Sequence, residues 1–350
     1  MKRTVIFALC AAALLFAGCK PAVKELPRGE ASAELSAAAD RFIGAAKKDL
    51  SWDIHSIMVL QHGKVLYEKW LGLGAPDEPH IMWSVSKTFT ATAVGFAIEE
   101  GLLKLDDKLI SFFPDDLPDK VTDNLAAMTV EHLLTMNTGH PGSIPTSGAA
   151  MEKGWEKYFL SQPVIHEPGT YFIYNSMASY MLSSIVQKVT GQKINDYLLP
   201  RLWKPLGIEQ PRWDENGHGV NCGGWGLFLK TEDMARMGLC LLNNGKFDGK
   251  QVIPASWVEQ MTTYKVPCQN AGATPEMVPD LEERNFMPDW REGYCYQMWR
   301  GAHNTVRADG AYGQYIILCP DKDAVIVLTD QAEDLQKILT LTWDEILAAL

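Results

Sequence analysis

The feature that most constrains the fold of this chain is that its strand-like segments lie at the two ends of the sequence. Near the N-terminus, the apolar runs 54–60 and 65–70 lie on either side of His62-Gly63, which predicts a β-hairpin. Near the C-terminus, strands are predicted at 293–299, 312–319 and 324–329. Strand signals are scarce between these two groups, which indicates that both ends of the chain build one sheet.

The segments between and beside these strands have helical spacing. Apolar residues recur with a helical period over 34–50, through most of 130–206, over 231–242 and over 331–347. We therefore expect an α+β fold, an α/β sandwich in which an antiparallel sheet of N- and C-terminal strands is flanked by helices. A mostly helical insert is expected at about 105–215, within one domain that spans 34–350. A loop rich in Pro, Asn, Gly and charge, 268–291, is expected to cover a pocket.

The first residues have the pattern of an export signal. A positive start is followed by an apolar run to residue 16 and by a small-residue cleavage site that ends in Cys19. The pattern resembles a bacterial lipoprotein signal, which implies removal of 1–18, a lipid on Cys19 and a tether over 19–33. We expect a protein anchored by its lipid alone to the outer membrane and facing the periplasm, with an ordinary secreted protein as the alternative.

Composition argues against a nucleic-acid partner and against a metal. The 350 residues carry a net charge of −11 and no cluster of Lys and Arg that could neutralise phosphates. The cysteines beyond Cys19 contain no Cys-x-x-Cys pair, so neither a zinc site nor a disulfide framework is indicated, although a single disulfide is left open. These are Cys222, Cys240, Cys268, Cys295 and Cys319.

The motif that indicates chemistry is Ser84-Val85-Ser86-Lys87 at the start of a predicted helix. Residues three apart in a helix lie one turn above each other, so the Lys87 amine can reach the Ser84 hydroxyl. Serine needs such a partner to attack a carbonyl at neutral pH. A helix start also offers an unpaired N–H where an oxyanion develops. The motif predicts acyl transfer, and the alternative is that Ser84 is only a helix N-cap.

A second segment, 168–176, makes the chain similar to a known family. It reads Pro-Gly-Thr-Tyr-Phe-Ile-Tyr-Asn-Ser. With Ser84-x-x-Lys87 it resembles the serine β-lactamase and penicillin-binding-protein superfamily, in the branch of class C β-lactamases, D-alanyl-D-alanine peptidases, carboxylesterases and nylon-oligomer hydrolases. The resemblance implies a β-lactamase/transpeptidase-like fold and a catalytic role for Tyr174. The family pattern is Tyr-x-Asn, and Ser176 stands here where asparagine is expected.

A third segment supplies the expected oxyanion hole. The family's Lys-Thr-Gly is missing from this chain, and the best match by position is 308–314. The resemblance implies that Gly310 lets the backbone approach the substrate. It also implies that the N–H groups of Ser84 and Ala311 stabilise the oxyanion.

Two further positions bear on the substrate. Asp309 would repel a substrate carboxylate, and Arg307 can offset it because residues two apart face the same side of a strand. Trp225, in Gly-Gly-Trp-Gly, resembles a family residue near the pocket and is expected in its wall. Asp309 and Ser176 together predict that the chain is no efficient β-lactamase.

These observations predict a serine hydrolase that cleaves a small ester or amide, or a cell-wall-derived substrate, through an acyl-enzyme on Ser84. Lys87 and Tyr174 would handle the proton, and no cofactor is implied. One alternative is a peptidoglycan D-amino-acid carboxypeptidase or amidase. Another is an inactive envelope binding protein. The presence of Ser84, Lys87 and Tyr174 together argues against this alternative. The sequence leaves the oligomeric state open.

Overall fold

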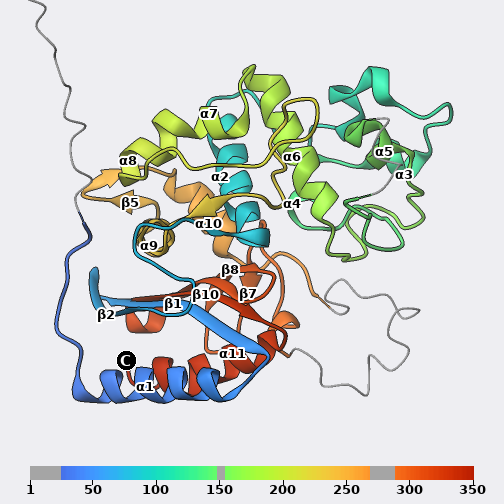
Figure 1. The fold of residues 1–350 in the computed structure, drawn as a ribbon. Helices are drawn as coiled ribbons and strands as arrows, with labels where there is room; N and C mark the ends of the chain where they lie inside the picture. The colour runs from blue at the N-terminus through green and yellow to red at the C-terminus, as the bar shows by residue number, and fades with distance from the viewer. Residues whose placement is uncertain (1–24, 148–153, 269–287) are drawn as a thin grey trace, which may run out of the picture.

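The computed structural model describes residues 25–147, 154–268 and 288–350. Its centre is a six-stranded antiparallel sheet in the order β2-β1-β10-β9-β8-β7 (Figure 1). The strands are β1 (Trp52–Gln61), β2 (Lys64–Trp70), β7 (Trp299–Arg300), β8 (Val306–Gly310), β9 (Gln314–Cys319) and β10 (Ala324–Ala332).

The two ends of the chain meet at the centre of this sheet. β1 pairs antiparallel with β10, for example Val59 with Ile326, and both side chains are fully buried. Central strands that are covered on both faces have continuous apolar runs, which here are 57–60 of β1 and 324–328 of β10. The prediction of an α+β fold with one sheet from both termini is confirmed.

Helices cover both faces of the sheet. On one face lie α1 (Ala33–Lys48), α11 (Leu335–Leu341) and the π-helical turn η8 (Thr342–Leu347), side by side below the strands in Figure 1. On the other face α9 (Thr231–Leu242) packs on β1, β9 and β10. Ser32 caps α1 by accepting a hydrogen bond from the Leu35 amide at 3.0 Å.

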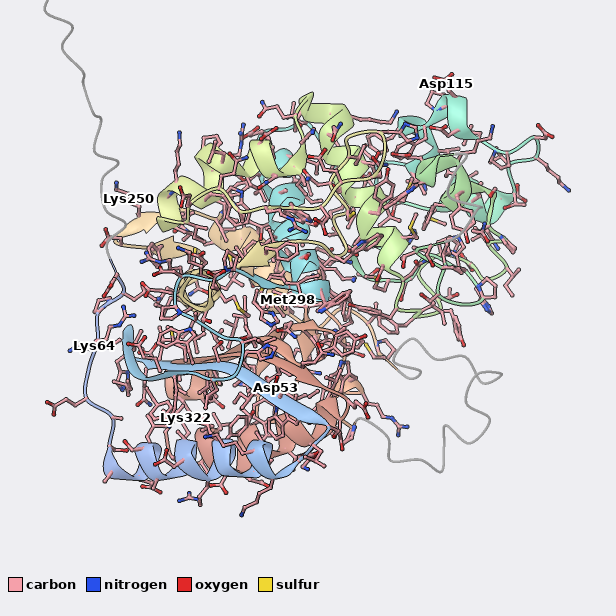
Figure 2. All side chains as sticks on the ribbon, viewed as in Figure 1. Asp53, Lys64, Asp115, Lys250, Met298 and Lys322 are labelled. Carbon is pink, nitrogen blue, oxygen red and sulfur yellow. The ribbon has the colours of Figure 1, made fainter. Side chains whose placement is uncertain are left out.

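A helical half lies above the α9 face, and α2 (Ser86–Glu99) runs through its middle with nearly every side chain buried. Side chains fill the space between this half and the sheet, and the buried Met298 lies there. Asp115 lies at the end of the helical half that is farthest from the sheet (Figure 2). The named elements within the described part of 105–215 are all helical. They are η2 (Leu109–Phe112), η3 (Pro114–Asp116), α3 (Asp123–Ala127), α4 (Val130–Leu134), α5 (Trp155–Ser161), α6 (Ser176–Thr190), α7 (Ile194–Leu198), the π-helical η5 (Leu199–Trp203) and α8 (Lys204–Leu206).

Short elements join the two halves. The paired strands β3 and β4 hold the chain just before Ser84 against the segment that follows Trp225. The remaining elements are β3 (His80–Ile81), η1 (Trp83–Val85), β4 (Phe228–Leu229), β5 (Lys246–Phe247), β6 (Lys250–Gln251), α10 (Ala255–Thr262), η6 (Pro288–Trp290) and η7 (Pro320–Lys322).

Two predicted boundaries in the C-terminal part are wrong. The run 293–299 is mostly a turn, because the Cys295 amide donates to the Met298 carbonyl at 2.8 Å and only the last residue belongs to β7. Arg307 and Asp309 lie on a strand as expected, and that strand, whose bounds were not predicted, is β8. The last helix begins at Leu335 and not at 331, because β10 continues to Ala332 in register with Trp52 of β1.

The described part of the expected tether is bonded to the domain. The Leu26 amide donates to Glu232 of α9 at 2.7 Å, and the Gly29 amide donates to the Val65 carbonyl of β2 at 2.8 Å. The predicted signal and Cys19 lie outside the described residues, as does 269–287 of the predicted covering loop. Within the described ranges no helix is long and apolar enough to cross a membrane.

Candidate active site

The segment that carries Ser84 enters α2 through a 3₁₀ turn. Ser84 lies in η1, one residue before the N-cap of α2, and its side chain is partly exposed. The Met82 amide donates to the Leu227 carbonyl at 2.8 Å, and Ser86 Oγ donates to the Trp83 carbonyl at 2.6 Å. These bonds fix Ser84 at the junction of the sheet and the helical half, with its hydroxyl open to a reactant.

The Lys87 amine lies buried at the centre of three acceptors. Lys87 Nζ is 2.8 Å from Ser84 Oγ, as the i, i+3 spacing predicts, 3.0 Å from Ser176 Oγ and 2.8 Å from the Gly224 carbonyl oxygen. Three acceptors match the three N–H donors of an ammonium group. A neutral amine in the same place keeps two donors and directs its lone pair at the third partner.

Burial lowers the pKa of Lys87 to about 7, and the negative charge of Asp309 opposes this shift. The direction follows from taking a cation out of water with no carboxylate in contact with it. A large share of the amine is therefore neutral near pH 7. A neutral amine beside a serine hydroxyl can act as a general base.

Tyr174 adjoins the same pair. Its ring centroid lies 4.8 Å from Lys87 Nζ. The ring stacks on Trp299 with centroids 5.3 Å apart. Burial raises the pKa of Tyr174 above its usual range, and the interaction of its hydroxyl with Ser84 acts against this. The phenol is thus protonated at neutral pH and can relay a proton more readily than it can serve as a phenolate base.

The helix α6 positions both Tyr174 and Ser176. Asn175 is its N-cap and accepts a hydrogen bond from the Met177 amide at 3.0 Å, which places Tyr174 just before the helix and Ser176 in its first turn. Ser176 turns toward Lys87, where its hydroxyl stands in place of the asparagine expected by resemblance.

The strand β8 forms another side of the site. The Arg307 guanidinium is fully buried and donates to Asp309 at 3.1 Å, as predicted from their spacing, and to the Arg300 carbonyl at 3.1 Å. Burial raises the pKa of Asp309 to about 6, and Arg307 opposes that shift. The positive charge of Arg307 therefore acts on Asp309 from the protein interior.

Gly310 lies against the protein's own backbone, whereas the resemblance implied that it would let the backbone approach the substrate. A Cβ atom there would lie 2.4 Å from the Met82 carbonyl oxygen, so the glycine lets β8 approach the segment before Ser84. Ala311 follows at the exposed tip of the β8–β9 turn. The oxyanion roles of the Ser84 and Ala311 amides stay predictions.

Aromatic residues line the rest of the site. Trp225 is half-buried and stacks on Trp155 with ring centroids 5.7 Å apart, next to the Gly224 carbonyl that binds Lys87. Its place in a pocket wall stays a prediction. Sequence reasoning included Gly224 only as part of Gly-Gly-Trp-Gly and gave it no role beside Lys87, because that contact spans 137 residues. It missed Trp299, which belongs to no recognised motif.

No group of three or more His, Cys, Asp or Glu side chains that could hold a metal ion occurs in the described part of the chain. The cysteines at 222, 240, 268, 295 and 319 are all buried and free of disulfides.

Comparisons with known proteins agree with this arrangement. A family model described as Beta-lactamase matches residues 36–349. The 6-aminohexanoate-dimer hydrolase of Paenarthrobacter ureafaciens is 27% identical over 292 residues, which are 78% of this chain and 71% of that protein.

Two solved structures have the same fold. EstCE1, described as a hydrolase with promiscuous acyltransferase activity, superposes with a TM-score of 0.68 at 16% identity, over 90% of this chain and 100% of its own. A penicillin-binding-protein homologue from Caulobacter crescentus superposes with a TM-score of 0.68 at 14% identity, over 92% of this chain and 99% of its own.

Proposed function

The chain belongs to the Beta-lactamase family, and from this premise we propose that it is a serine hydrolase that cleaves an ester or amide through an acyl-enzyme on Ser84. The observation that carries the proposal is the buried amine of Lys87, 2.8 Å from Ser84 Oγ and with a pKa lowered to about 7. A strongly shifted pKa of a buried group beside a partly exposed nucleophile is typical of a functional site.

The contacts of Lys87 support a definite first step. In the neutral amine, two N–H groups donate to Ser176 and to the Gly224 carbonyl, so the lone pair faces Ser84. Ser84 Oγ forms a bond to the carbonyl carbon while its proton passes to Lys87, and the carbonyl π-electrons move onto the oxygen. The Ser84 and Ala311 amides receive that oxyanion.

The second half of the reaction reverses these roles. The tetrahedral intermediate collapses, the bond to the leaving oxygen or nitrogen breaks, and that atom takes the proton from Lys87 through the Tyr174 hydroxyl. Water then attacks the acyl carbon and gives its proton to the same amine. The bond between that carbon and Ser84 Oγ breaks, Ser84 takes the proton back from Lys87, and the acid is released. The interaction of the Tyr174 hydroxyl with Ser84, and the Lys87 amine 4.8 Å from the centre of the Tyr174 ring, support this relay.

Substrates without a carboxylate beside the scissile bond suit the site best. Arg307, the cation nearest in sequence to Ala311, is fully buried and bonded to Asp309. An ionised Asp309 disfavours a second carboxylate. We therefore propose poor β-lactam hydrolysis, which nitrocefin turnover tests.

The first experiment is hydrolysis of p-nitrophenyl butyrate by residues 25–350, compared with the Ser84→Ala variant. We expect turnover that disappears in the variant, and a butyryl adduct on the Ser84 peptide by mass spectrometry. Ser86→Ala removes the hydroxyl that donates to the Trp83 carbonyl and keeps Ser84, so it measures how far damage to the turn alone lowers turnover. Equal activity of Ser84→Ala and the unchanged protein would favour the binding-protein alternative.

Cleavage of D-amino-acid peptides is the second activity to test. Release of D-alanine from a D-Ala-D-Ala peptide, lost in Ser84→Ala, would favour this activity over simple ester hydrolysis.

We also propose that Cys19 carries a lipid and anchors the protein at the outer membrane. Incorporation of labelled palmitate that is lost in Cys19→Ala would support the anchor, and incorporation that persists would refute it.

A further inference from the structure

Two aromatic residues beside the proposed oxyanion hole have a backbone conformation that bulky residues rarely adopt. Trp83 has a φ of 44° and Tyr312 a φ of 64°. A positive φ in a bulky residue is strained and persists only where its surroundings hold it. Trp83 directly precedes Ser84, and Tyr312 directly follows Ala311.

Hydrogen bonds to both carbonyls hold these conformations. The Trp83 carbonyl accepts from Ser86 Oγ at 2.6 Å, and the Tyr312 carbonyl accepts from the Ala332 amide at 3.1 Å. The close approach of Gly310 to Met82 brings the two segments together. As a result the two rings meet edge to face, with centroids 5.4 Å apart and planes at 61°.

Both strained residues keep part of the ring at the surface. Tyr312 is 40% exposed, and Trp83 is only partly buried. The open part of each ring can be covered by a bound group. A strained backbone that presents two partly exposed rings beside the proposed oxyanion hole points to a ligand that the two rings contact.

Resting on the proposed function, we propose that Trp83 and Tyr312 form an aromatic wall that binds a flat apolar acyl group, so that the site prefers esters or amides of aryl-bearing acids. The leaving group must face Lys87 and Tyr174, which return its proton. The two rings instead adjoin the amides of Ser84 and Ala311, which would hold the carbonyl oxygen, so they contact the acyl side. Aromatic faces bind such groups by offset or edge-to-face contact.

The test compares p-nitrophenyl phenylacetate with p-nitrophenyl acetate, which share a leaving group. Tyr312→Asn removes the ring with a residue that tolerates a positive φ, and Trp83→Asn does the same on the other segment. Tyr312→Phe keeps the ring and is the matched control. We expect the ratio of kcat/KM for phenylacetate to that for acetate to fall about tenfold in both Asn variants and to stay unchanged in Tyr312→Phe.

Two results would overturn the aromatic wall. One is an unchanged ratio in both Asn variants while acetate is still hydrolysed. The other is an equal loss on both esters, which would mean that the rings position the amides and do not bind the acyl group. Failure of the proposed function is recognised separately, because Ser84→Ala would then hydrolyse acetate as fast as the unchanged protein. Urea unfolding of each variant verifies that the fold persists.

Discussion

Replacing Gly310 by alanine tests whether the contact between β8 and the segment before Ser84 sets the geometry of the site. The new Cβ would lie 2.4 Å from the Met82 carbonyl oxygen and 3.0 Å from Gln314 Cβ, whereas ordinary contact begins at 3.4 Å. The methyl group and the carbonyl must therefore separate by about 1 Å. Neither neighbour is the free end of a flexible side chain, so backbone has to move.

That movement reaches the proposed nucleophile. The Met82 carbonyl accepts a hydrogen bond from the Val85 amide at 3.0 Å, and this bond closes the turn that contains Ser84. A misplacement of about 1 Å can lower activity by about 100-fold. Overpacking of this kind costs about 1–3 kcal/mol of folding free energy. We expect a large loss of kcat/KM with a moderate loss of stability.

The assay measures kcat/KM on p-nitrophenyl butyrate and the urea unfolding free energy of each variant. Gly217→Ala is the matched control, because a Cβ there has no neighbour within 4 Å and, as at Gly310, the backbone φ is not in the left-handed range. The reasoning would be refuted if Gly310→Ala kept the activity of the unchanged protein, or if Gly217→Ala lost as much.

Four further outcomes are expected. Ester kcat/KM should rise with pH through about 7 and then level off, because only the neutral Lys87 amine accepts the Ser84 proton, and a flat profile would contradict that role. The free energy of unfolding should rise with pH between about 7 and 10, since the unfolded chain binds a proton at Lys87 that the folded chain has lost, and urea titrations of Lys87→Met should lack this slope. Tyr174→Phe should lower kcat by about 10²–10⁴ while it stays folded by circular dichroism. Arg307→Met should destabilise the protein by about 3–5 kcal/mol in urea, because Asp309 stays buried without its cation, and a change below 1 kcal/mol would mean that Asp309 is neutral.

The sequence by itself determined those features that depend on neighbours along the chain. The reach of Lys87 to Ser84 follows from three-residue spacing, and the contact of Arg307 with Asp309 follows from two-residue spacing in a strand. The sheet built from both termini follows from where the strand-like runs lie. The error at 293–299 has the same origin, because an apolar run does not by itself distinguish a strand from a buried turn.

Only the tertiary structure decided the electrostatics and the shape of the site. Ser176 and Gly224 reach Lys87 from 89 and 137 residues away, and they define where its lone pair points. The lowered pKa of Lys87 comes from burial, which no local spacing encodes. Likewise, Trp83 and Tyr312 meet because β8 lies against the segment before Ser84. Periodicity fixes which side chains share one face of an element, whereas burial and long-range contacts depend on how the elements pack.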